Sequence, residues 1–203
     1  MVKAVKPIDI TATLRCKVAV VGEATVGKTS LISMFTSKGS KFPKAYTMTS
    51  GVDVTVAPVN IPDTTTLVEL YLLDTAGNEL YKDQISQYWN GVYYAILVFD
   101  VSSMESFEAC KAWLELLKSA RPDRERPLRA VMVANKVDLP PQRQQVRIDM
   151  AQEWATANGL DFFDVSSAPP GKDIEAPFVS IATTFYRNYE EKVTAFQDAC
   201  RNY

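Results

Sequence analysis

Residues 22–29 read Gly22-Glu23-Ala24-Thr25-Val26-Gly27-Lys28-Thr29, and they stand between an apolar run at 16–21 and an apolar stretch at 30–35. The two terminal glycines of this GxxxxGK(S/T) pattern let the backbone curl with its N–H groups pointing inward, where a Cβ would obstruct a polyphosphate. A loop of this kind between a predicted strand and a predicted helix indicates a phosphate-binding loop.

Within this loop, two side chains have their own chemistry. Lys28 can reach the β- and γ-phosphates as a mobile positive charge. Thr29 opens the predicted helix, whose positive end favours phosphate, and its hydroxyl can ligate Mg²⁺. We assign nucleotide binding to these two residues and to their neighbours Gly22, Ala24, Thr25, Val26, Gly27 and Ser30.

A second motif, Asp74-Thr75-Ala76-Gly77, follows a strand predicted at 70–73. The carboxylate of Asp74 can hold Mg²⁺ through water, and the N–H of Gly77 can donate to a γ-phosphate. The spacing therefore predicts that the metal and the terminal phosphate meet at the end of this strand.

A third motif, Asn135-Lys136-Val137-Asp138, follows an apolar strand predicted at 129–134. The carboxylate of Asp138 can accept hydrogen bonds from the ring N–H and the exocyclic amine of guanine together. Adenine lacks that ring N–H and would leave the carboxylate unpaired. Asn135, Lys136 and Asp138 therefore predict selection of guanine, and the three motifs together predict GTP or GDP with Mg²⁺ as the ligand.

Composition indicates one soluble α/β domain and excludes several functions. The 203 residues are 47% hydrophobic with a net charge of −2 and a pI near 5.3, so no basic surface argues for nucleic acid. Three scattered cysteines suit a reducing, cytoplasmic compartment, and the absence of histidine excludes histidine-based catalysis and zinc ligation. We expect the interaction partner to be another protein.

The order of apolar runs predicts the fold. Such runs alternate with helical stretches, including amphipathic ones at 104–120, 147–158 and 177–200, which predicts a mostly parallel sheet covered on both faces. Turn chemistry at 61–65 predicts one antiparallel edge strand. We expect a single domain at 14–203 after an extension at 1–13, with the motifs at the strand ends. The predicted strands lie at 14–21, 52–60, 66–73, 93–100, 128–134 and 161–165.

With these motifs in this order, the chain resembles a small GTPase of the Ras superfamily, nearest the Rab branch, over about 15–189. The resemblance implies a P-loop NTPase small G domain. It places Thr49, within the Rab-like first switch segment, where a ligand joins Mg²⁺ in the GTP state. Phe42 stands where the family has an aromatic beside guanine, although an ordinary loop aromatic is the alternative. Ser166 and Ser167 match the last guanine-binding motif loosely.

Two further stretches, 85–94 and 168–171, are similar to the Rab-like GTPases of intraflagellar transport complex B. That resemblance implies a stable heterodimer with a small β-sandwich subunit of the same complex. It also implies a location in the cilium or flagellum and at the basal body.

Asn78 departs from the Ras and Rab pattern, which has a water-orienting Gln after the Gly77 position. Together with Lys28 and Gly77 it is a candidate catalytic residue. Because Asn is one methylene shorter than Gln, its amide would lie roughly one C–C bond length farther from the attacking water. A misplacement of a catalytic group on the order of 1 Å can lower the rate about a hundredfold. We expect slow GTP hydrolysis, the alternative being that Asn substitutes fully.

The end of the chain departs from Rab proteins as well. Cys200 is fourth from the end, but its neighbours do not make a prenylation signal, and the Met1-Val2 start lacks the glycine for myristoylation, so we expect no lipid anchor. A helical stripe continues to Tyr189 and Phe196, which can pack in the core, the usual outcome, or meet a partner.

Three functions are compatible with these features. The chain can be a switch whose loops are ordered by GTP, a nucleotide-stabilised subunit of a transport assembly, or a membrane-traffic Rab. The last requires a lipidated Cys200 and ranks third. We expect a GTP-binding protein of transport complexes that combines the first two.

Overall fold

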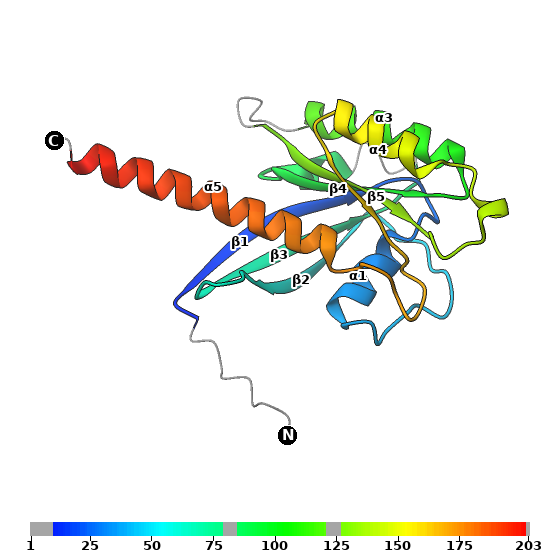
Figure 1. Ribbon diagram of the computed structural model, residues 1–203, viewed down its shortest axis with the longest axis horizontal. Coiled ribbons are helices and arrows are strands. Elements are labelled where there is room, and N and C mark those ends of the chain that lie inside the picture. The colour runs from blue at the N-terminus through cyan, green and yellow to red at the C-terminus, as the bar shows by residue number, and fades with distance from the viewer. Residues whose placement is uncertain (1–9, 79–84, 121–126, 202–203) are drawn as a thin grey trace, which may run out of the picture.

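The computed structural model describes residues 10–78, 85–120 and 127–201, which fold around a central six-stranded sheet (Figure 1). The strands lie in the order β2-β3-β1-β4-β5-β6, with β2 antiparallel to β3 and every other neighbouring pair parallel. The predicted mixed sheet with one antiparallel edge strand is confirmed. The strands are β1 (Ala12–Val21), β2 (Val52–Asn60), β3 (Thr66–Thr75), β4 (Tyr94–Asp100), β5 (Arg129–Asn135) and β6 (Asp161–Asp164).

Helices cover both faces of the sheet. α3 (Met104–Ala120) and α4 (Ile148–Ala157) lie over one face, while α1 (Lys28–Thr36) and α5 (Ala176–Arg201) lie over the other (Figure 1). Two short 3₁₀ turns are also present, η2 (Gln87–Trp89) and η3 (Pro141–Arg143). The helix predicted after β3 falls partly on residues outside the described ranges.

The central strand β1 explains this layering. Its alternate residues Val18 and Val20 pack with α1 and α5, while Ala19 and Val21 pack with the α3 side, and all four are fully buried. Apolar side chains on both faces are typical of parallel strands covered on both sides. The continuous apolar run of the sequence therefore has a direct structural cause.

α5 is the longest helix, and only its first half lies against the domain. Phe178 is fully buried and stacks on Phe35 of α1 with ring centroids 3.9 Å apart. By contrast, Tyr189 is 42% exposed and Phe196 is 70% exposed, so the expectation that the stripe stays in the core is wrong for these two. The distal turns run out beyond the sheet (Figure 1).

The carboxyl ends of the parallel strands meet at one edge of the sheet, which positions the candidate site. Asp74 and Thr75 are the last two residues of β3, because that strand continues two residues beyond its predicted end. Asp100 ends β4 and Asn135 ends β5. In the described ranges, no helix combines the length and apolarity needed to cross a membrane.

Candidate nucleotide-binding site

A cavity of about 400 Å³ opens at this edge of the sheet and is lined from all three sequence motifs. Four predicted residues do not line it but bond to residues that do, and these are Gly22, Val26, Asp74 and Ser166. The other predicted residues line it directly, and these are Ala24, Thr25, Gly27, Lys28, Thr29, Ser30, Phe42, Thr49, Gly77, Asn78, Asn135, Lys136, Asp138 and Ser167.

The two glycines of the phosphate-binding loop are required by close contacts. Gly22 has φ +144°, and a Cβ there would lie 2.1 Å from the carbonyl oxygen of Val98. Gly27 has φ +98°, and its Cβ would lie 2.4 Å from Nδ2 of Asn135. Both positions combine a backbone that disfavours L side chains with no room for a methyl group.

The side chain of Lys28 is buried and reaches back to the first residues of the phosphate-binding loop. Its Nζ donates to the carbonyl oxygens of Gly22 and Glu23, at 2.8 Å and 2.7 Å. Burial lowers the pKa of Lys28 to about 8, against the opposing influence of the Asp74 and Glu23 carboxylates. A buried ammonium with so little compensating charge is suited to a bound anion.

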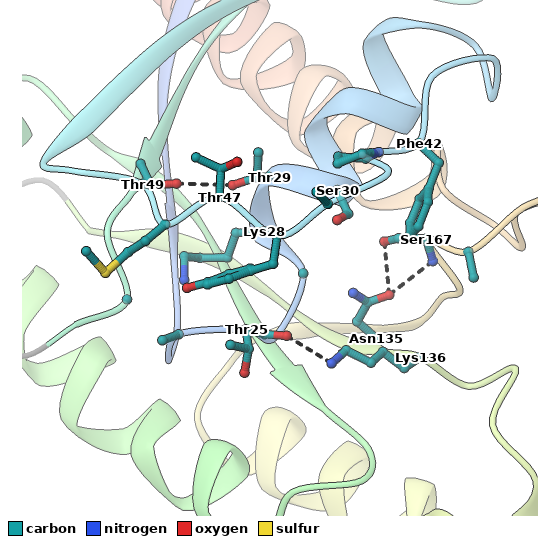
Figure 2. A pocket seen from close by; sticks show the side chains of 18 of the residues that line it. Thr25, Lys28, Thr29, Ser30, Phe42, Thr47, Thr49, Asn135, Lys136 and Ser167 are labelled. Atoms are coloured by element: carbon teal, nitrogen blue, oxygen red, sulfur yellow. Dashed lines mark hydrogen bonds between the residues drawn. The ribbon is translucent and has the colours of Figure 1, made fainter.

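At one end of the cavity, the hydroxyl groups of Thr29 and Thr49 lie close together (Figure 2), and the carboxylate of Asp74 bonds to Thr29. Thr29 Oγ1 donates to Asp74 Oδ2 at 2.6 Å, and the hydroxyl oxygens of Thr29 and Thr49 lie 3.2 Å apart. The other oxygen of Asp74, Oδ1, is buried without a hydrogen-bond partner in the described part of the chain. Burial raises the pKa of Asp74, while the Thr29 hydrogen bond and the charge of Lys28 act in the opposite direction.

This oxygen set fits Mg²⁺. The ion takes hard oxygen ligands and keeps several waters, and such a water can satisfy the orphaned Oδ1 of Asp74. Among the described residues, no group of three or more Cys, Asp and Glu side chains forms a different kind of metal centre. The hydroxyls of Thr29 and Thr49 and the carboxylate of Asp74 are therefore the residues that fit the ion.

At the other end, Asn135 joins two loops. Its Nδ2 donates to the Val26 carbonyl oxygen at 2.8 Å, and its Oδ1 accepts from the N–H and the hydroxyl of Ser167 at 3.1 Å and 3.0 Å. Ser166 donates to Asp138 Oδ1 at 2.5 Å, which orients an otherwise exposed carboxylate. The ring of Phe42, 40% exposed, lines the cavity as Ser167 does (Figure 2).

The second motif packs directly on the phosphate-binding loop. A Cβ on Gly77 would lie 2.4 Å from both the Ala24 nitrogen and the Glu23 carbonyl carbon. Only glycine allows this approach without a shift of backbone, since all the nearest atoms belong to the main chain. Asn78, which follows, is half-buried and lines the cavity.

Sequence reasoning missed three hydrogen bonds that support the phosphate-binding loop. Trp113 of α3 donates its indole N–H to Glu23 Oε1 at 2.9 Å. Lys136 donates to Asp100 Oδ2 at 2.6 Å and to the Thr25 carbonyl oxygen at 2.9 Å. Asp100 was detectable as an acid at the end of a buried strand, the same signal that identified Asp74, but the ion pair itself spans 36 residues of chain.

Comparison with known proteins gives a consistent result. The Ras family model matches residues 17–187. The chain is 85% identical to the intraflagellar transport protein 27 of Chlamydomonas reinhardtii, across 99% of this chain and 98% of that protein. It is 40% identical to the intraflagellar transport protein 27 homolog of Bos taurus, across 91% and 97%. The Ras-related protein Rab7 of Glycine max is 33% identical, across 89% and 87%.

Proposed function

Because this chain belongs to the Ras family of small GTP-binding proteins, in the group of the intraflagellar transport protein 27, we propose that it is a Mg²⁺-dependent GTPase with slow turnover that serves a ciliary transport assembly. One observation carries the nucleotide-binding part of the proposal. Motifs separated by more than 100 residues of sequence meet around one cavity of about 400 Å³. A cavity of that volume is in the range that small ligands occupy.

We assign the phosphate end of the site to residues of the first two motifs and to Thr49. Lys28 and Gly77 both line the cavity, and in this proposal the Lys28 ammonium would contact the β- and γ-phosphates while the Gly77 N–H would donate to the terminal phosphate. Thr29 and Thr49 would ligate Mg²⁺ by their hydroxyls, with Asp74 accepting from a bound water. When bound, the ion would neutralise phosphate charge, and these side chains would hold it in place.

The base end is assigned to Asp138, whose carboxylate is oriented by Ser166 and partly exposed to an incoming ring. The carboxylate accepts the two adjacent N–H groups that guanine presents. Phe42 supplies an aromatic face on the same side of the cavity as Ser167 (Figure 2). This arrangement supports guanine over adenine as the base.

Slow hydrolysis is tested most directly by the Asn78→Gln variant, which restores one methylene. If Asn78 holds the attacking water too far back, single-turnover hydrolysis of bound GTP in Mg²⁺ should accelerate, by up to about a hundredfold. Asn60→Gln makes the same chemical change at an exposed position at the end of β2 and should leave the rate unaltered.

The outcome also separates two modes of action. A markedly faster Asn78→Gln variant supports a chain that keeps GTP long enough to act as a stable subunit of an assembly. Equal rates at the level of ordinary small GTPases contradict slow hydrolysis and favour an autonomous switch.

We also propose that the chain forms a heterodimer with a small β-sandwich subunit of complex B, in the cytoplasm, cilium and basal body. The names of its relatives support a role in intraflagellar transport, and the exposed Tyr189 and Phe196 of distal α5 offer an apolar contact surface for a partner. Light scattering of the native protein purified from ciliated cells should give a 1:1 complex with a second small subunit. A native monomer would contradict the heterodimer.

A further inference from the structure

We infer that Asp100 is a positioning residue that slows nucleotide release by holding Lys136 against the phosphate-binding loop. The inference rests on the proposed nucleotide site and adds a residue outside its three motifs. Asp100 ends β4, is only 8% exposed and does not line the cavity. It therefore acts through another side chain and not by touching the ligand.

Both oxygens of Asp100 are already used inside the protein. Oδ1 accepts from the backbone N–H and the hydroxyl of Ser102 at 2.8 Å and 2.7 Å, and Oδ2 accepts from Lys136 Nζ at 2.6 Å. Burial alone would raise the pKa of Asp100, but the hydrogen bonds from Lys136 and Ser102 hold it below its ordinary value. The group is thus a fixed negative charge at the strand end.

Lys136 passes this constraint to the loop. Its Nζ also donates to the Thr25 carbonyl oxygen at 2.9 Å (Figure 2), and Asn135 beside it donates to the Val26 carbonyl oxygen at 2.8 Å. Two successive loop carbonyls are therefore turned toward the end of β5. In a trans peptide the N–H points opposite to the carbonyl, so the next two N–H groups are turned to the other side of the loop.

Those N–H groups belong to Val26 and Gly27, in the stretch that has to surround a polyphosphate. Thr25 in this loop and Lys136 after β5 have φ of +65° and +68°, where L side chains are uncommon, so both backbones need support from surrounding contacts. A lysine side chain is long and flexible, so its position depends on what its ammonium bonds. Asp100 is the charged group that bonds the Lys136 ammonium and so fixes its position.

The Asp100→Asn variant tests this role. It keeps the shape but removes the charge, so fluorescent GDP in Mg²⁺, chased with excess unlabelled GDP, should dissociate about tenfold faster. Ser102→Ala keeps the charge but removes one donor to the same carboxylate, and it should give about a threefold increase. Glu69→Gln, at the ion pair with Arg15 on the remote end of the sheet, is the matched control and should leave the rate unaltered.

Combining Asp100→Asn with Lys136→Met distinguishes a role of Asp100 through Lys136 from a purely structural role. If Asp100 acts through Lys136, the double variant should release GDP no faster than Lys136→Met alone, whereas multiplying effects would overturn the inference. Unchanged dissociation in both Asp100→Asn and Ser102→Ala would overturn it as well. Failure of the unaltered protein to retain GDP would instead contradict the proposed function.

Discussion

Replacing Gly27 by alanine should weaken GDP binding by about 30-fold to 4000-fold, and the size follows from a backbone conformation and a close contact in the structure. At φ +98° an alanine costs about 1–2 kcal/mol. Its Cβ would lie 2.4 Å from Asn135 Nδ2, displacing the amide from the buried Val26 carbonyl for about 1–3 kcal/mol more. An empty loop can relax, so the total of about 2–5 kcal/mol opposes binding, at about tenfold per 1.4 kcal/mol.

Competition binding of fluorescent GDP against unlabelled GDP measures this loss. Gly39→Ala is the matched control, because Gly39 also has positive φ, +81°, but a methyl group there would meet no atom of the described residues within 4 Å. The control should lower stability by about 1–2 kcal/mol and leave GDP affinity unaltered. Equal GDP affinity in Gly27→Ala and the unaltered protein would refute the contact-based reasoning.

Four further substitutions test separate parts of the account. Phe178→Ala should lower the free energy of unfolding by about 3–5 kcal/mol in urea, because a fully buried ring is lost. The same change at Phe196, 70% exposed, should cost less than about 0.5 kcal/mol, and equal losses would contradict the described burial of α5. Thr29→Val removes the hydroxyl bonded to Asp74, so chelating Mg²⁺ with EDTA should weaken GDP binding far less than in the unaltered protein. An unchanged response to EDTA would argue against that metal assignment. Gly77→Ala should slow single-turnover GTP hydrolysis at least about tenfold, since its methyl forces the second motif away from the loop, while an unaltered rate would contradict the packing.

The fold and the position of the site were predictable because both depend on local patterns. Apolar runs with the motifs directly behind them specify parallel strands, and the strand ends then collect Asp74 and Asn135 at one edge. The antiparallel edge pair followed from turn residues between two strand-like runs, and the structure has the corresponding turn with Asp63 at φ +58°. The family and the mixed sheet are confirmed, while the role of each site residue stays a prediction.

What sequence reasoning missed depends on contacts between distant residues. The Lys136 contacts with Asp100 and Thr25 span 36 and 111 residues, and spacing along the chain carries no information on such pairs. The exposure of Tyr189 and Phe196 was missed for a different reason. A helical stripe repeats with the same period whether or not a sheet lies beneath it, and α5 extends past the sheet (Figure 1).

Equilibrium binding of GDP and xanthosine diphosphate, by the unaltered protein and by Asp138→Asn, tests the central claim most directly. Xanthine has a carbonyl where guanine has its exocyclic amine, so a carboxylate favours guanine and a carboxamide, which can donate, favours xanthine. We expect the unaltered protein to prefer GDP and Asp138→Asn to lose or reverse that preference. Identical discrimination in the two proteins would contradict the assignment of this cavity to guanine nucleotides.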